Sequence, residues 1–469
     1  MVASLIDSAA PVDQRVRALV IAAAAAFMVY LDATIANVAF PAIHASFPSV
    51  REGSLSWVLN SYNIAFAALL MPAGVLLDRF AQSRERLLAV ALLGFSVASL
   101  CCALAPSEAW LVGFRGLQGL AAGALIPAGL SVLLARESEQ RLRALAILAS
   151  SAALAASLGP SVGGVLVHVL GWRSIFLLNL PIGLLAALGA DRLRAIAVRG
   201  RDFAGGVSLG VSVCAAGGVG VLSLTLSDGS AWGWLSLPTL LCALAGGGLL
   251  AVAVARARAN ANEDSRRLFS APASTANVAG ALLAMAFLGK ILTDVLFLTG
   301  VWHYSILQAG LALTPGPIIT TVLAVPCARL AERVSVRAVA AAGGLVYAAG
   351  AGWYALRAGA TPDYLRDWLP GALLTGAGLA LALPALTSAA LSQATPSQYG
   401  AAAAVNATAR ALGGTVGIAA TTAIVAGASG IDPFRQAWSI VLVAAISSTA
   451  VMCWPLRVPS ARLVQQRSA

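Results

Sequence analysis

Five charged side chains lie inside long apolar stretches of the sequence, where a charge is costly unless it is paired. They are Asp32, Arg115, Lys290, Asp294 and Arg410. A charged side chain at the centre of a bilayer costs about 2.5–3.5 kcal/mol on insertion scales. Charges kept at such depth mark ion pairs, proton sites or substrate contacts. These five side chains are therefore the first candidates for function.

Asp32 and Arg115 fall at comparable depth on two predicted membrane spans. At 1.5 Å per helical residue, Asp32 lies ~13 Å from the outer end of the first span and Arg115 lies ~9 Å inside the fourth. A carboxylate there is neutralised either by an arginine or by a proton, and switching between these states is a proton-coupling device. A static structural ion pair is the alternative. We expect Asp32 to be the proton-coupling site and Arg115 to be its charge partner.

The other charged residues allow two interpretations each. Lys290 and Asp294 are four residues apart, so they share one helix face and can pair locally. This pair either neutralises itself to lower the cost of insertion or forms a second charged site on a cavity wall. Arg410, one turn after Asn406, either holds a partner carboxylate or faces a cavity. Tyr62 on the second span joins these four as a cavity candidate, although aromatic residues at its spacing more often pack or anchor a helix.

A second kind of candidate supplies close backbone contact. Gly159, Gly163 and Gly164 lie in one apolar helix together with Pro160. A stripe of small residues lets another helix backbone approach closely inside a membrane. Proline removes one backbone donor and predicts a kink or soft point in that helix. We expect this stretch to be a packing surface that can rock.

The chain that carries these residues is too apolar for a soluble protein. Of its 469 residues, 59% are hydrophobic and 10% are charged, whereas about a quarter of a soluble protein is charged. A membrane-spanning helix needs about 20 apolar residues. Fourteen such stretches are predicted, at 18–40, 54–76, 87–105, 109–134, 144–168, 174–190, 205–225, 236–255, 275–299, 308–328, 338–356, 369–390, 400–426 and 437–456.

The distribution of arginine among the loops supports this predicted topology. Segments on the side of the N-terminus, such as 191–202 and 256–267, are rich in arginine, and the opposite loops contain few. Cytoplasmic loops carry the excess of positive charge in membrane proteins. The sequence therefore predicts an even number of spans with both termini in the cytoplasm. It also assigns the net charge of +11 to loops that face anionic lipid, which argues against nucleic acid as a partner.

Internal similarity predicts two related halves. The segments 73–88 and 327–340 both follow a small-residue helix end with an acid next to an arginine and then more arginine. Repeated helical halves with a site between them are the usual plan of a transporter. We expect a six-helix bundle at 1–190, two additional linker spans within 191–267, and a second six-helix bundle with a short tail at 268–469.

Several motifs that would indicate an enzyme are missing from the sequence. The sole lysine, Lys290, belongs to no phosphate-binding G-x-x-x-x-G-K loop, and no G-x-G-x-x-G, H-E-x-x-H or paired Cys/His set occurs. The six cysteines fall in apolar runs without a C-x-x-C. We expect no enzyme activity, no metal and no cofactor, so that transport against a gradient would use the proton gradient.

The motifs together resemble one family over nearly the whole chain. LDATIANVAFP (31–41), LVGFRGLQGLAAG (111–123), the Gly-Pro-x-x-Gly-Gly motif in the fifth span, LQAGLALTPG (307–316) and the Asn-x-x-x-Arg-x-Leu-Gly-Gly pattern in the thirteenth span are similar to those of the fourteen-span drug:proton antiporter branch of the major facilitator superfamily. The resemblance implies an all-α integral membrane protein of 14 helices, in which two six-helix bundles move around a central cavity.

The loop between the second and third spans departs from the pattern of this family. The family's G-x-L-x-D-R-x-G-R-R stands here as GVLLDRFAQSR (74–84). In the family this loop latches the cytoplasmic face. Gly74, Asp78 and Arg79 remain, and Arg84 or Arg86 must compensate for the lost basic positions, so we expect a weakened cytosolic latch.

The resemblance implies a function. We expect a monomeric, proton-coupled antiporter in the bacterial inner membrane that exports drugs or other amphipathic small molecules by alternating access. A dedicated exporter of one metabolite, such as an antibiotic, or of a lipid is the first alternative. A membrane-embedded enzyme or a sensor is a remote one.

Overall fold

The computed structural model describes nine segments of the chain, on which all structural statements below rest. They are residues 12–50, 52–79, 83–136, 141–193, 209–233, 235–259, 270–392, 399–425 and 430–453. All regular structure in these segments is helical. The helices are α2 (Val12–Ser46), α3 (Glu52–Leu55), α4 (Trp57–Arg79), α5 (Arg84–Ala103), α6 (Glu108–Arg136), α7 (Arg141–Leu170), α8 (Ser174–Leu177), α9 (Asn179–Asp191), α10 (Leu209–Trp232), α11 (Leu237–Ala259), α13 (Ala271–Gly300), α14 (Ile306–Leu313), α15 (Pro315–Arg333), α16 (Val336–Arg357), the π-helical turn η2 (Tyr364–Trp368), α17 (Leu369–Leu391), α18 (Tyr399–Val425) and α19 (Asp432–Cys453).

The predicted fold class is confirmed, because the chain is an all-helical, multi-pass membrane protein. Apolar segments fold as helices in a bilayer because a helix satisfies its own backbone hydrogen bonds. Each of the fourteen predicted stretches overlaps a described helix. In the described segments, ten helices are long and apolar enough to cross a membrane. Leu158–Leu170 and Ser174–Ala190 meet at a bend of 119°, and α4 and α10 contain shorter apolar stretches, so the count of fourteen crossings stays a prediction.

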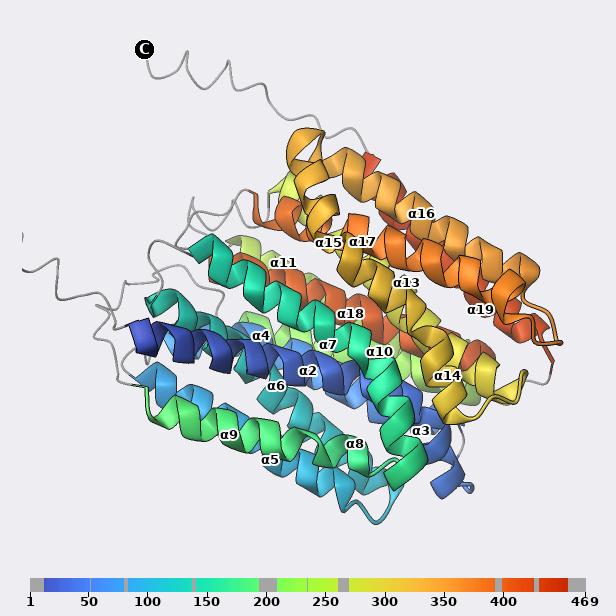
Figure 1. Cartoon of the computed structure of the whole chain (residues 1–469), viewed down its shortest axis with the longest axis horizontal. Helices are drawn as coiled ribbons and strands as arrows, with labels where there is room; N and C mark the ends of the chain where they lie inside the picture. Colours follow the sequence, from blue (N-terminus) through green and yellow to red (C-terminus); the bar gives the residue numbers. More distant parts are fainter. Residues whose placement is uncertain are drawn as a thin grey trace, which may run out of the picture.

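The helices pack as two groups that repeat the same set of neighbours. In the first group α2 packs against α6, α7 and α9, and α5 packs against α6 and α9. In the second group α13 packs against α17, α18 and α19, and α16 packs against α17 and α19. Figure 1 shows α2, α5, α6 and α9 on one side of the molecule and α13, α16, α17 and α19 on the other. We call these groups the first half and the second half.

Helices α10 and α11 lie outside this repeat. They pack closely on each other at two glycines, because a Cβ added at Gly218 would lie 2.8 Å from the carbonyl oxygen of Gly246, and the reverse distance is also 2.8 Å. Such contacts are typical of tightly packed membrane helices. Helix α10 also contacts α4 of the first half and α18 of the second. The pair therefore covers the seam where α4 meets α18.

Among the described residues, the largest apolar core common to both halves lies at one end of the molecule. We call the end at which α2 begins the proximal end and the end at which α2 finishes the distal end. One distal core joins Leu31 and Ile35 of the first half to Leu292 and Phe297 of the second. Toward the proximal end the described buried residues form a separate main core in each half, with a small cluster of Ala22 and Leu133 in the first half. Ala411 of α18, 9% exposed, packs into the main core of the first half. The described conformation is therefore closed by packing at its distal end.

Candidate functional site

Asp32 and Arg115 form a buried ion pair between α2 and α6. Arg115 Nη1 donates to Asp32 Oδ2 at 2.5 Å, and both side chains are 1% exposed. The pair holds its geometry because α2 and α6 pack directly on each other. The sequence placed the two residues at similar depth on neighbouring spans, and the structure brings them into contact.

Three amide and hydroxyl side chains complete the surroundings of Asp32. Gln118 Nε2 donates to Asp32 Oδ1 at 2.9 Å, and Asn179 Nδ2 donates to the same oxygen at 2.8 Å. Both amides also donate to Ser99 Oγ, at 2.6 Å from Gln118 and 3.2 Å from Asn179. The Oε1 atom of Gln118 accepts from Arg115 Nη1 at 2.7 Å. Asp32 thus accepts hydrogen bonds from α6 and α9, and the network reaches α5 through Ser99.

An aromatic and backbone shell holds the guanidinium of Arg115. Its Cζ atom lies 4.1 Å from the centre of the Tyr62 ring, and its Nε atom donates to the Val58 carbonyl at 3.0 Å. Tyr62 is 1% exposed, and its hydroxyl donates to the Val29 carbonyl at 3.1 Å. Cation–π contact with a desolvated guanidinium contributes about 2 kcal/mol. The structure therefore places Tyr62, predicted as a cavity residue, against the cation of the Asp32 site.

In this network, binding of one proton to Asp32 would break its ion pair with Arg115. Burial of an ion pair is costly unless the remaining donors and acceptors are satisfied, and here both carboxylate oxygens of Asp32 have donors. Protonation of Asp32 would remove its charge and release Arg115 for another partner. Such a change of partner requires the site to open, because Asp32 and Arg115 are closed to solvent in this conformation.

Lys290 and Asp294 form a second buried ion pair, on α13 of the second half. Lys290 Nζ donates to Asp294 Oδ2, and the other oxygen of Asp294 accepts from Trp438 Nε1 at 2.9 Å. Lys290 Nζ lies 4.7 Å from the centre of the Tyr354 ring. Lys290 is 8% exposed and Asp294 is 0% exposed. The pairing expected from their spacing is present, and aromatic side chains of α16 and α19 enclose it.

Arg410 on α18 is partly exposed and differs from the two buried cations, Arg115 and Lys290. In the described part of the chain Arg410 has no ion pair, and its Nε atom is buried without a hydrogen-bond partner. Asn406, one turn earlier, donates to Asn277 of α13 at 3.0 Å. Ala411, next to Arg410, packs into the core of the first half. Arg410 therefore lies where α18 meets both halves, without a partner carboxylate among the described residues.

The glycines of the fifth predicted span face two different helices. A Cβ at Gly159 would collide with Thr34 of α2, and a Cβ at Gly163 would lie 2.9 Å from Cγ1 of Ile35. A Cβ at Gly164 would instead lie 3.1 Å from the carbonyl oxygen of Ile306, which begins α14. Helix α7, with Pro160 inside it, thus packs closely on the first half at one face and on the second half at another.

A hydrogen bond crosses the same contact between the halves. Ser161 Oγ and Thr314 Oγ1 lie 2.6 Å apart, and either atom can be the donor. The kink predicted at Pro160 and the rocking motion predicted for this helix stay predictions.

The predicted cytosolic latch falls mainly outside what the structure describes. Helix α4 ends at Arg79 and α5 begins at Arg84. Residues 80–82, and the side chains of Gly74, Asp78 and Arg79, lie outside the description. The latch therefore stays a prediction.

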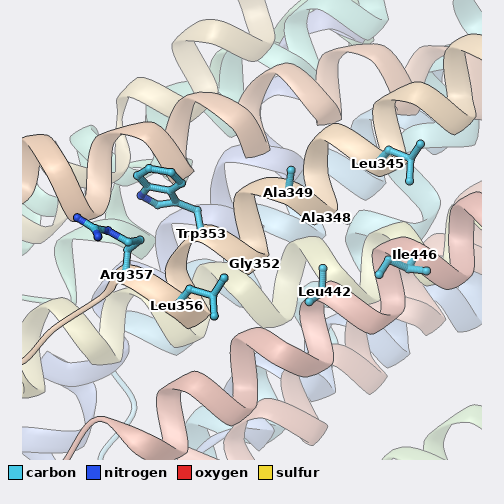
Figure 2. A pocket seen from close by; sticks show the side chains of 9 residues that line it. All are labelled: Leu345, Ala348, Ala349, Gly352, Trp353, Leu356, Arg357, Leu442 and Ile446. Atoms are coloured by element: carbon cyan, nitrogen blue, oxygen red, sulfur yellow. The ribbon is translucent and has the colours of Figure 1, made fainter.

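An apolar groove lies on the outside of the second half, between α16 and α19 (Figure 2). Its volume is about 490 Å³, and its lining is Leu345, Ala348, Ala349, Gly352, Trp353, Leu356, Arg357, Leu442 and Ile446. Leu356 is 80% exposed and Leu345 is 56% exposed, so this groove faces the surroundings of the helices. It contains none of the five charged candidates. Among the described residues no group of three or more His, Cys, Asp or Glu side chains is placed to hold a metal ion.

Two helical halves with a buried ion pair in each define a membrane protein of the transporter class. The family model of the Major Facilitator Superfamily matches residues 22–202. The multidrug resistance protein Stp of Mycobacterium tuberculosis is 31% identical over 408 residues, which cover 85% of this chain and 74% of that protein. The cephamycin export protein CmcT of Amycolatopsis lactamdurans is 34% identical over 417 residues, which cover 86% of this chain and 83% of that protein. The chain belongs to the major facilitator superfamily.

Solved structures agree on the fold. The crystal structure of the POT family transporter PepTSo superposes with a TM-score of 0.68 at 14% identity, covering 97% of this chain and 98% of that one. A bacterial homologue of the human lysosomal transporter Spinster, in an inward-facing and unoccupied conformation, gives a TM-score of 0.65 at 15% identity. The match covers 94% of this chain and 95% of that one. At these identities the likeness concerns the fold alone.

Gln118, Asn179 and Ser99 belong to the site but are not among the site residues predicted from the sequence. Gln118 is three residues after Arg115, which places both on one face of α6. Asn179 is an uncharged polar residue at the start of a predicted span. Helix spacing from Arg115 and uncharged polar side chains inside apolar spans are the sequence signals that indicate these three residues.

Proposed function

We propose that this chain is a proton-coupled exporter of amphipathic small molecules, with Asp32 as the proton-binding group and Arg115 as its charge partner. The observation that carries the proposal is the Asp32 carboxylate, which is 1% exposed and holds Arg115 and two amides on its two oxygens. A proton that binds Asp32 breaks this arrangement and frees Arg115. The network spans four helices of one half, so its rearrangement can change how those helices pack.

The proposed transport cycle is alternating access between the two halves. The described conformation is closed at the distal end by a core common to both halves. We propose that the distal end faces the outside of a bacterial inner membrane and that both termini are cytoplasmic. Opening the distal end would then admit a proton to Asp32 and release the exported compound. In this proposal residues 1–190 and 268–469 are the moving bundles, residues 191–267 carry the added pair of spans, and the chain acts as a monomer.

The relatives support export as the direction of transport. One is named a multidrug resistance protein, another a cephamycin export protein, and a third, from Streptomyces alboniger, a puromycin resistance protein that is 29% identical over 96% of this chain and 93% of its own length. Export of many drugs is the leading candidate. Export of a single antibiotic is the second candidate, and the relative named for cephamycin export favours it. A susceptibility panel of dyes, quaternary ammonium compounds and antibiotics, with and without the gene, separates a broad profile from a single compound.

The test of proton coupling is transport by the Asp32→Asn variant. In everted membrane vesicles energised with a proton gradient, this variant should lose efflux of the compounds found in the panel at unchanged protein level. Asp432→Asn is the matched control, because the Asp432 side chain is 83% exposed at the start of α19. Undiminished efflux by Asp32→Asn would remove Asp32 from the mechanism.

We further propose Arg410 and Asn406 as substrate contacts. Of the three cations predicted inside spans, Arg115 and Lys290 each have a carboxylate partner, and Arg410 has none among the described residues. A guanidinium favours an anionic group such as a carboxylate. Arg410→Gln should therefore weaken export of acidic compounds more than export of cationic ones in the same panel. An equal loss for both classes would contradict a recognition role.

A further inference from the structure

We propose that Asp294 is a second proton-exchanging carboxylate, with Lys290 as its partner, so that each half of the protein carries one such site. The inference rests on the proposed function and extends it from one proton site to two. It follows from where Asp294 lies in the second half, from the nature of its cation, and from an unpartnered hydroxyl on α16, the helix whose Tyr354 ring faces Lys290.

Asp294 occupies the place in the second half that Asp32 occupies in the first. Helix α13 has the same neighbours in its half, α17, α18 and α19, that α2 has in α6, α7 and α9. Asp32 accepts a hydrogen bond from Asn179 near the distal start of α9, and Asp294 accepts one from Trp438 near the distal start of α19. The two carboxylates therefore lie on corresponding helices, and each accepts a hydrogen bond from a corresponding helix of its half.

The cation of the second site differs in a way that favours proton exchange. The first half supplies Arg115 from α6. The corresponding helix α17 has Gly371 against Tyr354, where an added Cβ would lie 2.7 Å from the ring, so α17 has no room for a side chain there. The cation comes instead from Lys290 on the same helix as Asp294. Lysine binds a carboxylate as a point charge, whereas arginine presents a planar fork of five donors. A proton therefore displaces fewer cation contacts at Asp294.

The proton balance of the site is simple. In the ion pair Asp294 is an anion and Lys290 a cation, and the site has no net charge. One proton added to a carboxylate oxygen makes Asp294 neutral and leaves the site with a charge of +1 on Lys290. The face of the Tyr354 ring, 4.7 Å from Lys290 Nζ, then remains to stabilise the ammonium. Loss of that proton restores the pair, so one proton is bound and released in each cycle.

An unpartnered hydroxyl marks a route for the proton. Tyr347 is 1% exposed and lies two turns before Tyr354 on α16. Its hydroxyl has no hydrogen-bond partner in the described part of the chain. Leaving a buried polar group unpaired costs about 1–3 kcal/mol, and an ordered water commonly fills such a place. Water at Tyr347 would lead from the proximal core toward Asp294.

The titratable groups around Asp294 are few. Lys290 lies on its own helix, and Tyr347 and Tyr354 come from α16. Helix α19 contributes the indole of Trp438, and in the described segments no charged side chain of α17 or α18 makes a hydrogen bond or ion pair with Asp294. A proton change at this site is therefore assigned to Asp294 and Lys290.

Infrared difference spectroscopy of the full-length protein in liposomes, titrated with pH, tests the proposal, and the proton itself is the probe. The carbonyl stretch of a protonated carboxylic acid reports each buried carboxyl that titrates. We expect Asp294→Asn to lose one such band that the wild type and Asp32→Asn both retain. Asp32→Asn should lose a different band. A spectrum of Asp294→Asn that matches the wild type would overturn the proposal.

A second variant covers the case in which Asp294→Asn does not fold. Removing one partner of a buried ion pair is strongly destabilising, whereas replacing both is often neutral. The Lys290→Met/Asp294→Asn variant should fold and lack the same band. The same band in this folded variant would overturn the proposal. Solute transport is measured separately, so a protein that moves no solute but loses the band at Asp294 refutes the exporter and leaves this inference standing.

Discussion

The contact between α7 and α14 tests whether the two halves separate at the distal end. A Cβ added at Gly310 would lie 2.5 Å from the carbonyl oxygen of Pro160 and 3.1 Å from Cα of Gly164. Both neighbours are backbone atoms, so they cannot swing away as the end of a side chain can. Gly310→Ala therefore disfavours the described conformation relative to one in which α7 and α14 are apart.

The size of the effect follows from the crowding. Overpacking of this kind costs about 1–3 kcal/mol, which corresponds to a shift of about 5–150-fold between two conformations. Gly164→Ala should act in the same direction but less, because its Cβ would be 3.1 Å from the carbonyl oxygen of Ile306 and 3.4 Å from Cα of Gly310. Gly113→Ala is the matched control, because a Cβ at Gly113 meets nothing within 4 Å.

The assay is a distance measurement between spin labels on the two helices. Val169 on α7 is 68% exposed and Leu311 on α14 is 53% exposed, so both accept labels in a background without the six native cysteines. Double electron–electron resonance should show a larger population at longer label-to-label distance, increasing in the order Gly113→Ala, Gly164→Ala, Gly310→Ala. An unchanged distribution in folded Gly310→Ala, or an equal shift in the Gly113→Ala control, would refute the reasoning.

Three further changes probe separate contacts. Arg115→Lys loses the planar group that donates to Asp32 and to a backbone carbonyl. Because a hydrogen bond to a charged group contributes about 1.5–3 kcal/mol, efflux in vesicles should fall at least about tenfold. Near-normal efflux would show that any cation at this position suffices. Ser161→Ala removes the hydrogen bond to Thr314 and should shift the spin-label distances in the same direction as the glycine variants, whereas a shift to shorter distances would contradict a closing role. His303 has φ 53°, a region that β-branched residues rarely enter. His303→Val should therefore lower the thermal unfolding temperature in detergent, whereas His303→Gly should not. Equal stability of both variants would show that the turn relaxes.

Much of the fold was predictable because hydropathy dominates in a bilayer. Each predicted apolar stretch overlaps a helix, and the contact of Asp32 with Arg115 follows from depth and span order. The pairing of Lys290 with Asp294 follows from a spacing of four residues on one helix. These features depend on local periodicity and on the cost of burying charge, which a single sequence carries.

Other features depend on how distant helices meet, which the sequence does not specify. Nothing in the spacing of Trp438 assigns it to Asp294, because the two are joined only when α19 packs on α13. Asn179 reaches Asp32 for the same reason, through the packing of α9 on α2. The separate faces of α7 that Gly163 and Gly164 present to α2 and α14 likewise appear only when both halves are assembled.

The hairpin of α10 and α11 makes the two flanks of the molecule unequal. On the flank where α4 meets α18, α10 contacts both helices and covers the seam between them. On the opposite flank α7 meets α14 and α15, and the hairpin makes no comparable contact there in the described part of the chain. A hydrophobic compound that approaches from the lipid would therefore meet the hairpin on one flank of the molecule and the halves themselves on the other.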